Sequence, residues 1–131
     1  MTPIVLDASS GVEIALQTPI GRRLQARLPA DAVGWVPEHY FAEAVAVLRR
    51  QVLHQRHPEG RVQIALDRLL GAPLHSVSIR PLVREAWPMR HNLTIADALY
   101  VVVALHLGAP VVTTDLRLAR SPGLRVATIT P

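Results

Sequence analysis

Residues 98–107 are apolar almost throughout, and this feature constrains the fold more than any other. Thr94, with Asp97 three residues later, has the form of a capping box, which predicts a helix start. A helix that is apolar around its whole circumference has to be buried. Gly108 predicts the C-terminal cap of this helix. Residues 111–113 are β-branched and predict a short strand, so a buried helix is expected directly before a strand.

The rest of the chain repeats this alternation of helices and short apolar runs. Strands are expected at residues 3–6, 35–36, 74–79, 111–113 and 124–129, and helices at 9–17, 19–28, 38–54, 58–70, 81–89 and 94–107. We expect Ser9 or Ser10 to cap the first of these helices. The first strand lacks polar alternation, which is typical of a strand buried on both faces. The pattern favours the three-layer α/β/α class, with a mostly parallel sheet of about five strands and the last strand at an edge. We expect a single domain over residues 1–131.

Composition excludes several classes of function. No apolar run reaches the ~18 residues that span a bilayer, and the start lacks a charged signal-peptide region, so we expect a cytoplasmic protein without membrane attachment. The absence of cysteine excludes disulfides, thiolate metal sites and thiol nucleophiles. All 14 basic residues are arginine, which excludes mechanisms that need lysine, including that of phosphoacceptor receiver domains. A net charge of +4 and a pI near 11.0 are compatible with a polyanionic partner.

Four acidic residues are expected at one edge of the sheet. Asp7 ends the first strand, and Asp115 follows the penultimate strand. Asp97 and Glu43 lie near helix starts, and helices of an open parallel sheet begin at the edge where its strands end. Glu43 has apolar neighbours and no cation at helical spacing, which makes an unpaired carboxylate costly. Each acid alone also suits a plainer role as a cap, a turn residue or a surface charge, and Glu13 is the chief rival for a site role.

Carboxylates gathered on one edge raise one another's pKa unless a cation lies between them. Because the chain has no lysine, and none of these acids has an arginine at helical spacing, a divalent metal is the natural candidate. All-oxygen ligands favour Mg²⁺ or Mn²⁺ over zinc or copper. The six histidines lack the spacing of a metal site, and we expect His39 at the surface or at a helix cap. One or two such ions can activate a water and stabilise the leaving oxygen of a phosphodiester.

Four segments support a resemblance to a known family. In chain order, VLDASS, AEAVAVLRR, LTIADALYVVVAL and VVTTDLRLA resemble the PIN-domain ribonucleases, and more narrowly the VapC-type toxins of bacterial toxin–antitoxin pairs. The resemblance covers essentially the whole chain. It implies a PIN-like fold, Mg²⁺-dependent cleavage of RNA to 3′-hydroxyl and 5′-phosphate ends, a homodimer, and an antitoxin that covers the active site. It also implies that the catalytic, metal-binding acids are Asp7, Glu43, Asp97 and Asp115.

The resemblance extends to residues around these acids. It assigns Thr113 as the family's small hydroxyl residue near the site, and Ser9 is expected to assist the acids without binding the metal. Arg117 and Arg120 are expected to hold the RNA backbone. Arg117 stands where many relatives have another acid, which leaves one-metal occupancy open. Two alternatives remain at this point: a PIN-like module that has lost catalysis and binds RNA or an antitoxin, and a Mg²⁺-dependent nuclease that acts on DNA.

Overall fold

A parallel sheet forms the centre of the molecule. The computed structural model describes residues 1–54 and 56–131. Within them the strands are β1 (Thr2–Leu6), β2 (Ala32–Pro37), β3 (His75–Val77), β4 (Val111–Val112) and β5 (Thr128–Ile129). They pair in the order β3-β2-β1-β4-β5, and each pairing is parallel. The predicted sheet is confirmed, including the last strand at an edge.

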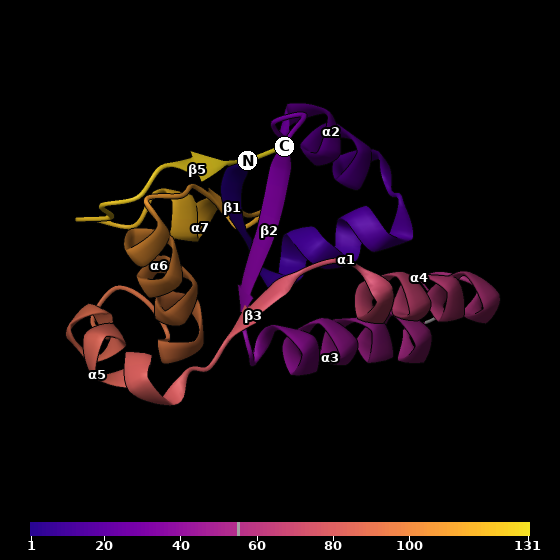
Figure 1. Cartoon of the computed structure of the whole chain (residues 1–131). Coiled ribbons are helices and arrows are strands. Elements are labelled where there is room, and N and C mark those ends of the chain that lie inside the picture. Colours follow the sequence, from indigo (N-terminus) through magenta and orange to yellow (C-terminus); the bar gives the residue numbers. More distant parts are fainter. Residues whose placement is uncertain (55) are drawn as a thin grey trace.

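Helices cover both faces of this sheet. They are α1 (Ala8–Leu16), α2 (Pro19–Arg27), α3 (Tyr40–Leu53), α4 (Glu59–Gly71), α5 (Val83–Ala86), α6 (Ile95–Leu107) and α7 (Leu116–Ala119), with 3₁₀ turns η1 (Arg80–Leu82) and η2 (Trp87–Met89). In Figure 1, α5 and α6 lie to one side of β1 and β2, whereas α1 and α2 lie to the other. The α3–α4 pair extends beyond the sheet and packs against α1. The three-layer α/β/α class is therefore confirmed.

Neighbouring residues of β1 face the two opposite layers, as the geometry of a strand requires. Ile4 packs in a cluster with Leu24 of α2, whereas Val5 belongs to the cluster that contains Val103 of α6. Both β1 residues are at most 2% exposed. The absence of polar alternation in this strand is therefore explained by apolar packing on both faces.

The expected features of the buried helix are confirmed. The Asp97 amide donates to the Thr94 hydroxyl at 3.1 Å, which caps the start of α6. Gly108 has a φ of +61° and caps its end in the left-handed conformation that glycine adopts at low cost. Residues 98–104 are all buried. None of the helices among the described residues combines the length and apolar character needed to cross a membrane.

Two predictions about helix starts are wrong. The cap of α1 is Asp7, not Ser9 or Ser10, because the Asp7 carboxylate accepts a hydrogen bond from the Ser10 amide at 2.9 Å. The helix expected from residue 38 begins at Tyr40, because β2 continues to Pro37 and a turn follows it.

Two predictions near the C-terminal half also need correction. The helix expected at residues 81–89 is split into η1, α5 and η2, with Pro81 and Pro88 each lying in a 3₁₀ turn. Proline lacks an N–H group and restricts the residue before it, so no continuous helix forms there. The strand expected at 124–129 shortens to Thr128–Ile129, and the short α7 after Asp115 was not predicted.

Candidate functional site

The four predicted acids lie in one region, where the strands of the sheet end. Asp7 directly follows β1, and Asp115 caps α7 after β4. Glu43 and Asp97 lie in the first turns of α3 and α6. The pKa of Asp97 is raised mainly by burial, and the negative charges of the other three acids raise it further. The four carboxylates are therefore close enough to interact electrostatically.

Asp7 is the most buried of these acids, with 6% of its surface exposed. Burial raises its pKa, and hydrogen bonds from Thr113, Ser10 and Ser9 oppose this effect. The Ser9 hydroxyl donates to Asp7 Oδ1 at 2.7 Å. The carboxylate is thus held in one orientation by groups on its own turn and by Thr113 at the end of β4.

Hydroxyl groups join the end of β1 to the end of β4. Ser9 Oγ accepts from the Thr114 amide at 3.2 Å, and Thr113 Oγ1 accepts from the Asp115 amide at 2.9 Å. The fully buried Ser10 donates to the Val112 carbonyl, with an O···O distance of 2.7 Å. Ser9 and Thr113 therefore lie beside Asp7 as the resemblance implies. The role of Ser10 was missed, because nothing in the sequence indicates a partner 102 residues away.

Glu43 is held by side chains from two helices. Its Oε1 accepts from the Tyr100 hydroxyl at 2.7 Å, and His39 Nε2 lies 3.3 Å from the same oxygen. His39 is the N-cap residue of α3, as one of the two expectations for it had it, but its side chain makes no capping hydrogen bond and only 16% of it is exposed. Its Nε2 instead lies 3.0 Å from the Ala96 carbonyl of α6. The contact of Tyr100 with Glu43 was missed, because the sequence presents Tyr100 only as part of the apolar stretch 98–107.

Asp115 and the two predicted RNA-binding arginines lie on the outer side of this region. Asp115 Oδ1 accepts from the Arg117 amide at 2.9 Å, and Arg117 Nε lies 3.5 Å from it. The Arg117 side chain is 95% exposed, and Arg120 is also exposed. The ion pair of Arg117 with Asp115 stabilises the fold little because it is exposed. Since the side chains of Arg117 and Arg120 are both exposed, their guanidinium groups are accessible to a ligand.

Glu13, the rival candidate, belongs to a different part of the molecule. Its carboxylate accepts a hydrogen bond from the Thr18 hydroxyl, and Thr18 also caps α2 through the Gly21 amide. The charge of Glu13 is not among those that raise the pKa of Asp97. Glu13 therefore joins α1 to α2, and the acid group consists of the other four residues.

The donor set fits a hard divalent cation, although the side chains are not arranged around one. Across residues 1–54 and 56–131, no three aspartate, glutamate or histidine side chains are gathered closely enough to hold an ion. The hydrogen bonds that the described residues make to Glu43 and Asp115 end on Oε1 and Oδ1, which leaves Oε2 and Oδ2 available as metal ligands. Among the described residues, the one arginine in an ion pair with these acids is the exposed Arg117, and crowded carboxylates of this kind favour a cation with oxygen ligands. Three of the four carboxylates can bind one ion only if their side chains turn toward one another.

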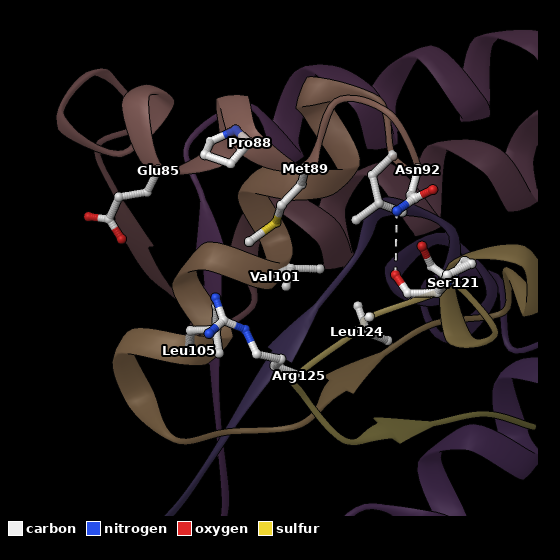
Figure 2. Close-up of a pocket in the computed structure, with 12 residues that line it drawn as sticks. Glu85, Pro88, Met89, Asn92, Val101, Leu105, Ser121, Leu124 and Arg125 are labelled. Atoms are coloured by element: carbon white, nitrogen blue, oxygen red, sulfur yellow. Dashed lines mark hydrogen bonds between the residues drawn. The ribbon is translucent and has the colours of Figure 1, made fainter.

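Two adjoining hollows lie on the side of the acid group where Asp97 and Asp115 are found. A cavity of about 190 Å³ is lined by Asp97, Asp115 and Arg117, among others. It shares Asn92 and Leu93 with a larger groove of about 310 Å³ between η2, α6 and the loop at 121–125, which Figure 2 shows.

None of the four acids lines the larger groove. Met89, Val101 and Leu124 give it apolar walls, visible in Figure 2. Its one acid, Glu85, lies 2.8 Å from His106 Nε2 and is thereby engaged. We therefore place the candidate site at the smaller cavity.

The chain is similar to known proteins over nearly its whole length. The model of the PIN domain family matches residues 4–124. Ribonuclease VapC12 of Mycobacterium tuberculosis is 35% identical to this chain over 120 residues, which cover 92% of each protein. Among solved structures, PAE2754 from Pyrobaculum aerophilum is similar with a TM-score of 0.68 and 21% identity, over 98% of this chain and 84% of that one. A toxin–antitoxin complex from Klebsiella pneumoniae has a chain with a TM-score of 0.60 and 13% identity, over 98% of this chain and 97% of that one.

Proposed function

Because this chain belongs to the PIN domain family, and within it to the VapC proteins, we propose that it is a Mg²⁺-dependent endoribonuclease that acts as the toxin of a toxin–antitoxin pair. The observation that carries the proposal is the group of four acids at the strand ends, where the negative charges of three raise the pKa of the fourth, Asp97. The ribonuclease name of a relative with 35% identity supports RNA as the substrate.

In this proposal Asp7, Glu43, Asp97 and Asp115 hold Mg²⁺, which Mn²⁺ can replace. A bound divalent ion supplies an activated water and stabilises the charge that develops on the leaving oxygen. Ser9 and Thr113 keep the Asp7 carboxylate in one orientation through their hydrogen bonds. The charge of the acid group supports an ion at this place, since no lysine exists in the chain to neutralise it.

The reaction is the hydrolysis of one phosphodiester bond. Water adds to phosphorus and the bond from phosphorus to O3′ breaks, which leaves a 3′-hydroxyl and a 5′-phosphate. Arg117 is exposed beside Asp115, Arg120 is exposed at the other end of α7, and a guanidinium group matches a phosphate with two parallel hydrogen bonds. We propose that these arginines hold the RNA backbone on either side of the scissile phosphate.

Replacing one acid tests this function. Asp97→Asn keeps the Thr94 cap and the helix, so it should remain folded and lose Mg²⁺-dependent cleavage. The loss should exceed the roughly 10- to 100-fold that removal of an outer hydrogen-bond partner costs a metal enzyme. The measurement is the mapping of 5′-phosphate ends in total RNA after expression. Glu13→Gln is the matched control and should keep full activity, whereas an active Asp97→Asn protein refutes the assignment.

We propose three further properties of the same protein. It forms one domain over residues 1–131, it acts in the cytoplasm as a homodimer, and a cognate antitoxin covers its acid group. The family model matches residues 4–124, which supports the single domain. Co-expression with the cognate antitoxin should abolish RNA cleavage, and light scattering of the purified protein should give twice the chain mass.

One observation favours a second candidate, a PIN-like binding module with weak or no catalysis. In the described part of the chain, no three acids are arranged to hold an ion together. Calorimetry with Mn²⁺ at neutral pH separates the two candidates. Binding that Asp97→Asn abolishes supports the nuclease, and its stoichiometry distinguishes one ion from two. No binding by the wild-type protein supports the module.

A further inference from the structure

Glu43 and Asp97 belong to different helices, and three contacts join those helices beside the two acids. The Tyr100 hydroxyl of α6 donates to Glu43 Oε1 of α3 at 2.7 Å. His39 Nε2, at the start of α3, lies 3.0 Å from the Ala96 carbonyl of α6. The rings of His39 and Tyr100 also pack together, with centroids 4.9 Å apart and an angle of 52° between their planes.

The contacts of His39 determine which ring nitrogen carries its hydrogen. A carbonyl can only accept, so Nε2 must donate to Ala96, and Glu43 Oε1 at 3.3 Å is a second acceptor for the same hydrogen. Its Nδ1 is buried and has no hydrogen-bond partner among the described residues. The ring therefore acts through Nε2 alone, and it connects α3 to the residue next to Asp97.

Tyr100 is an equally constrained donor. Tyr100 is 1% exposed, and its hydroxyl hydrogen is directed at Glu43 Oε1. Both Tyr100 and His39 act on Oε1 of Glu43, whereas the hydrogen bonds made by the described residues leave Oε2 without a donor. One oxygen of this carboxylate is thus fixed by protein groups, and the other is available to a ligand.

We propose that His39 and Tyr100 form a clamp between α3 and α6 that sets the position of Glu43 relative to Asp97 and leaves Glu43 Oε2 available as a metal ligand. The inference rests on the proposed metal site. Both are positioning residues, because they act through Glu43. Partners of this kind orient metal ligands, and their loss costs about 10- to 100-fold in metal affinity or activity.

The clamp is tested with Tyr100→Phe, which removes the hydroxyl and keeps the ring that packs on His39. Tyr40→Phe is a matched control. Tyr40 is also 1% exposed and lies at the start of α3, but its hydroxyl makes no hydrogen bond to an acid in the described part of the chain. The measurements are Mn²⁺ affinity by calorimetry at neutral pH, unfolding temperature, and kcat and KM for RNA over a range of Mg²⁺ concentrations.

We expect Tyr100→Phe to raise the Kd for Mn²⁺ by about 10- to 100-fold, and Tyr40→Phe to leave it within about twofold of the wild-type value. At low Mg²⁺ concentration the kcat of Tyr100→Phe should fall while its KM for RNA stays unchanged, and high Mg²⁺ should restore kcat. His39→Ala should show the same rise in Kd, because it removes the contact with Ala96.

The possible failures differ from one another. If wild type and Tyr100→Phe bind Mn²⁺ equally tightly, the clamp is refuted and the proposed nuclease stands. The same holds if Tyr100→Phe and Tyr40→Phe lower the unfolding temperature alike without any change in Kd, since that result indicates a packing role only. A wild-type protein that binds no Mn²⁺ overturns both the metal site and the clamp.

Discussion

Asp7 and Asp97 are two carboxylates that the fold places where the charged form is unfavourable. Burial is the main cause of the raised pKa in both, and for Asp97 the charges of Glu43, Asp115 and Asp7 add to it. The folded protein without metal therefore binds a proton at these groups more tightly than the unfolded chain does. Stability that depends on these protons is present at low pH and is lost as the pH rises above the ordinary value of 3.8.

The stability of the metal-free protein should depend on the charge of Asp97. Asp97→Asn removes a charge that burial and three neighbouring acids disfavour, so it should raise the unfolding temperature at neutral pH by several degrees, as expected for about 1 kcal/mol in a domain of this size. Thermal unfolding in EDTA from about pH 4 to about pH 7 measures this, and the difference between variant and wild type should grow with pH. Mg²⁺ should then raise the unfolding temperature of the wild-type protein but not that of Asp97→Asn. An unfolding temperature that the substitution does not change contradicts this prediction.

Replacing the adjacent serines Ser9 and Ser10 by alanine should have different effects on stability and on RNA cleavage. Ser10→Ala removes one of the two donors to the Val112 carbonyl, which keeps only the Asp7 amide at 3.1 Å, and we expect a loss of about 0.5–1.5 kcal/mol in the free energy of unfolding. Ser9→Ala removes the donor to Asp7 at the partly buried site and should lower cleavage about tenfold with a smaller effect on stability. Urea unfolding and RNA cleavage measured on both variants test this contrast, which fails if the two serines behave alike.

Packing between elements holds the acid group together. A Cβ atom at Gly11 of α1 would lie 2.0 Å from the Tyr40 hydroxyl of α3, so only glycine permits these helices to approach so closely. Arg61 and Arg68 of α4 donate to the carbonyls of Leu16 and Ala15 in α1. These bonds satisfy the free carbonyls at the C-terminal end of α1. The position of α1, which begins at Asp7, therefore depends on both α3 and α4.

At the scale of elements, Gly11→Ala should destabilise the protein by about 1–3 kcal/mol because α1 and α3 have to move apart. Gly60→Ala in α4 is the control, since a Cβ there meets nothing within 4 Å. It should be neutral or stabilise the helix by up to about 1 kcal/mol. Chemical unfolding of both variants gives the comparison, and equal stability of the two would show that the close approach is unimportant.

At the scale of the whole molecule, charge governs how a polyanion binds. The chain carries a net charge of +4, and all 14 basic residues are arginine. Because contacts to phosphate release counterions, RNA affinity should fall steeply as the salt concentration rises. The exposed arginines next to the acid group should account for part of this dependence, and the more distant ones should matter less.

The corresponding prediction compares two double variants of equal charge. Arg117→Gln with Arg120→Gln should weaken RNA binding and reduce the slope of log Kd against log salt by about 1.4, or about 0.7 for each lost phosphate contact. Arg22→Gln with Arg23→Gln, on the exposed face of α2, should leave the slope nearly unchanged. The Asp97→Asn background keeps the RNA intact during the measurement. Equal slopes for the two double variants would show that only the net charge matters.

Local patterns in the sequence were enough to predict the alternation of strands and helices, the buried helix α6 with its Thr94 and Gly108 caps, and the grouping of the four acids where the strands end. These features were predictable because caps, glycines and hydrophobic periodicity act over a few residues. Predictions failed at element boundaries, as where Pro81 and Pro88 divide one expected helix into three parts. There the local signal was present but its strength was underestimated.

Which groups hold the acids depends on tertiary packing. The structure joins Glu13 to Thr18, brings Ser10 to Val112, and places the half-buried His39 against Glu43 and the Ala96 carbonyl of α6. The contacts of His39 with Ala96 and of Ser10 with Val112 join residues that lie 57 and 102 positions apart, and they depend on how the helices pack against the sheet. No short-range pattern records that packing, because a side chain's hydrogen-bond partner is selected by its neighbours in space.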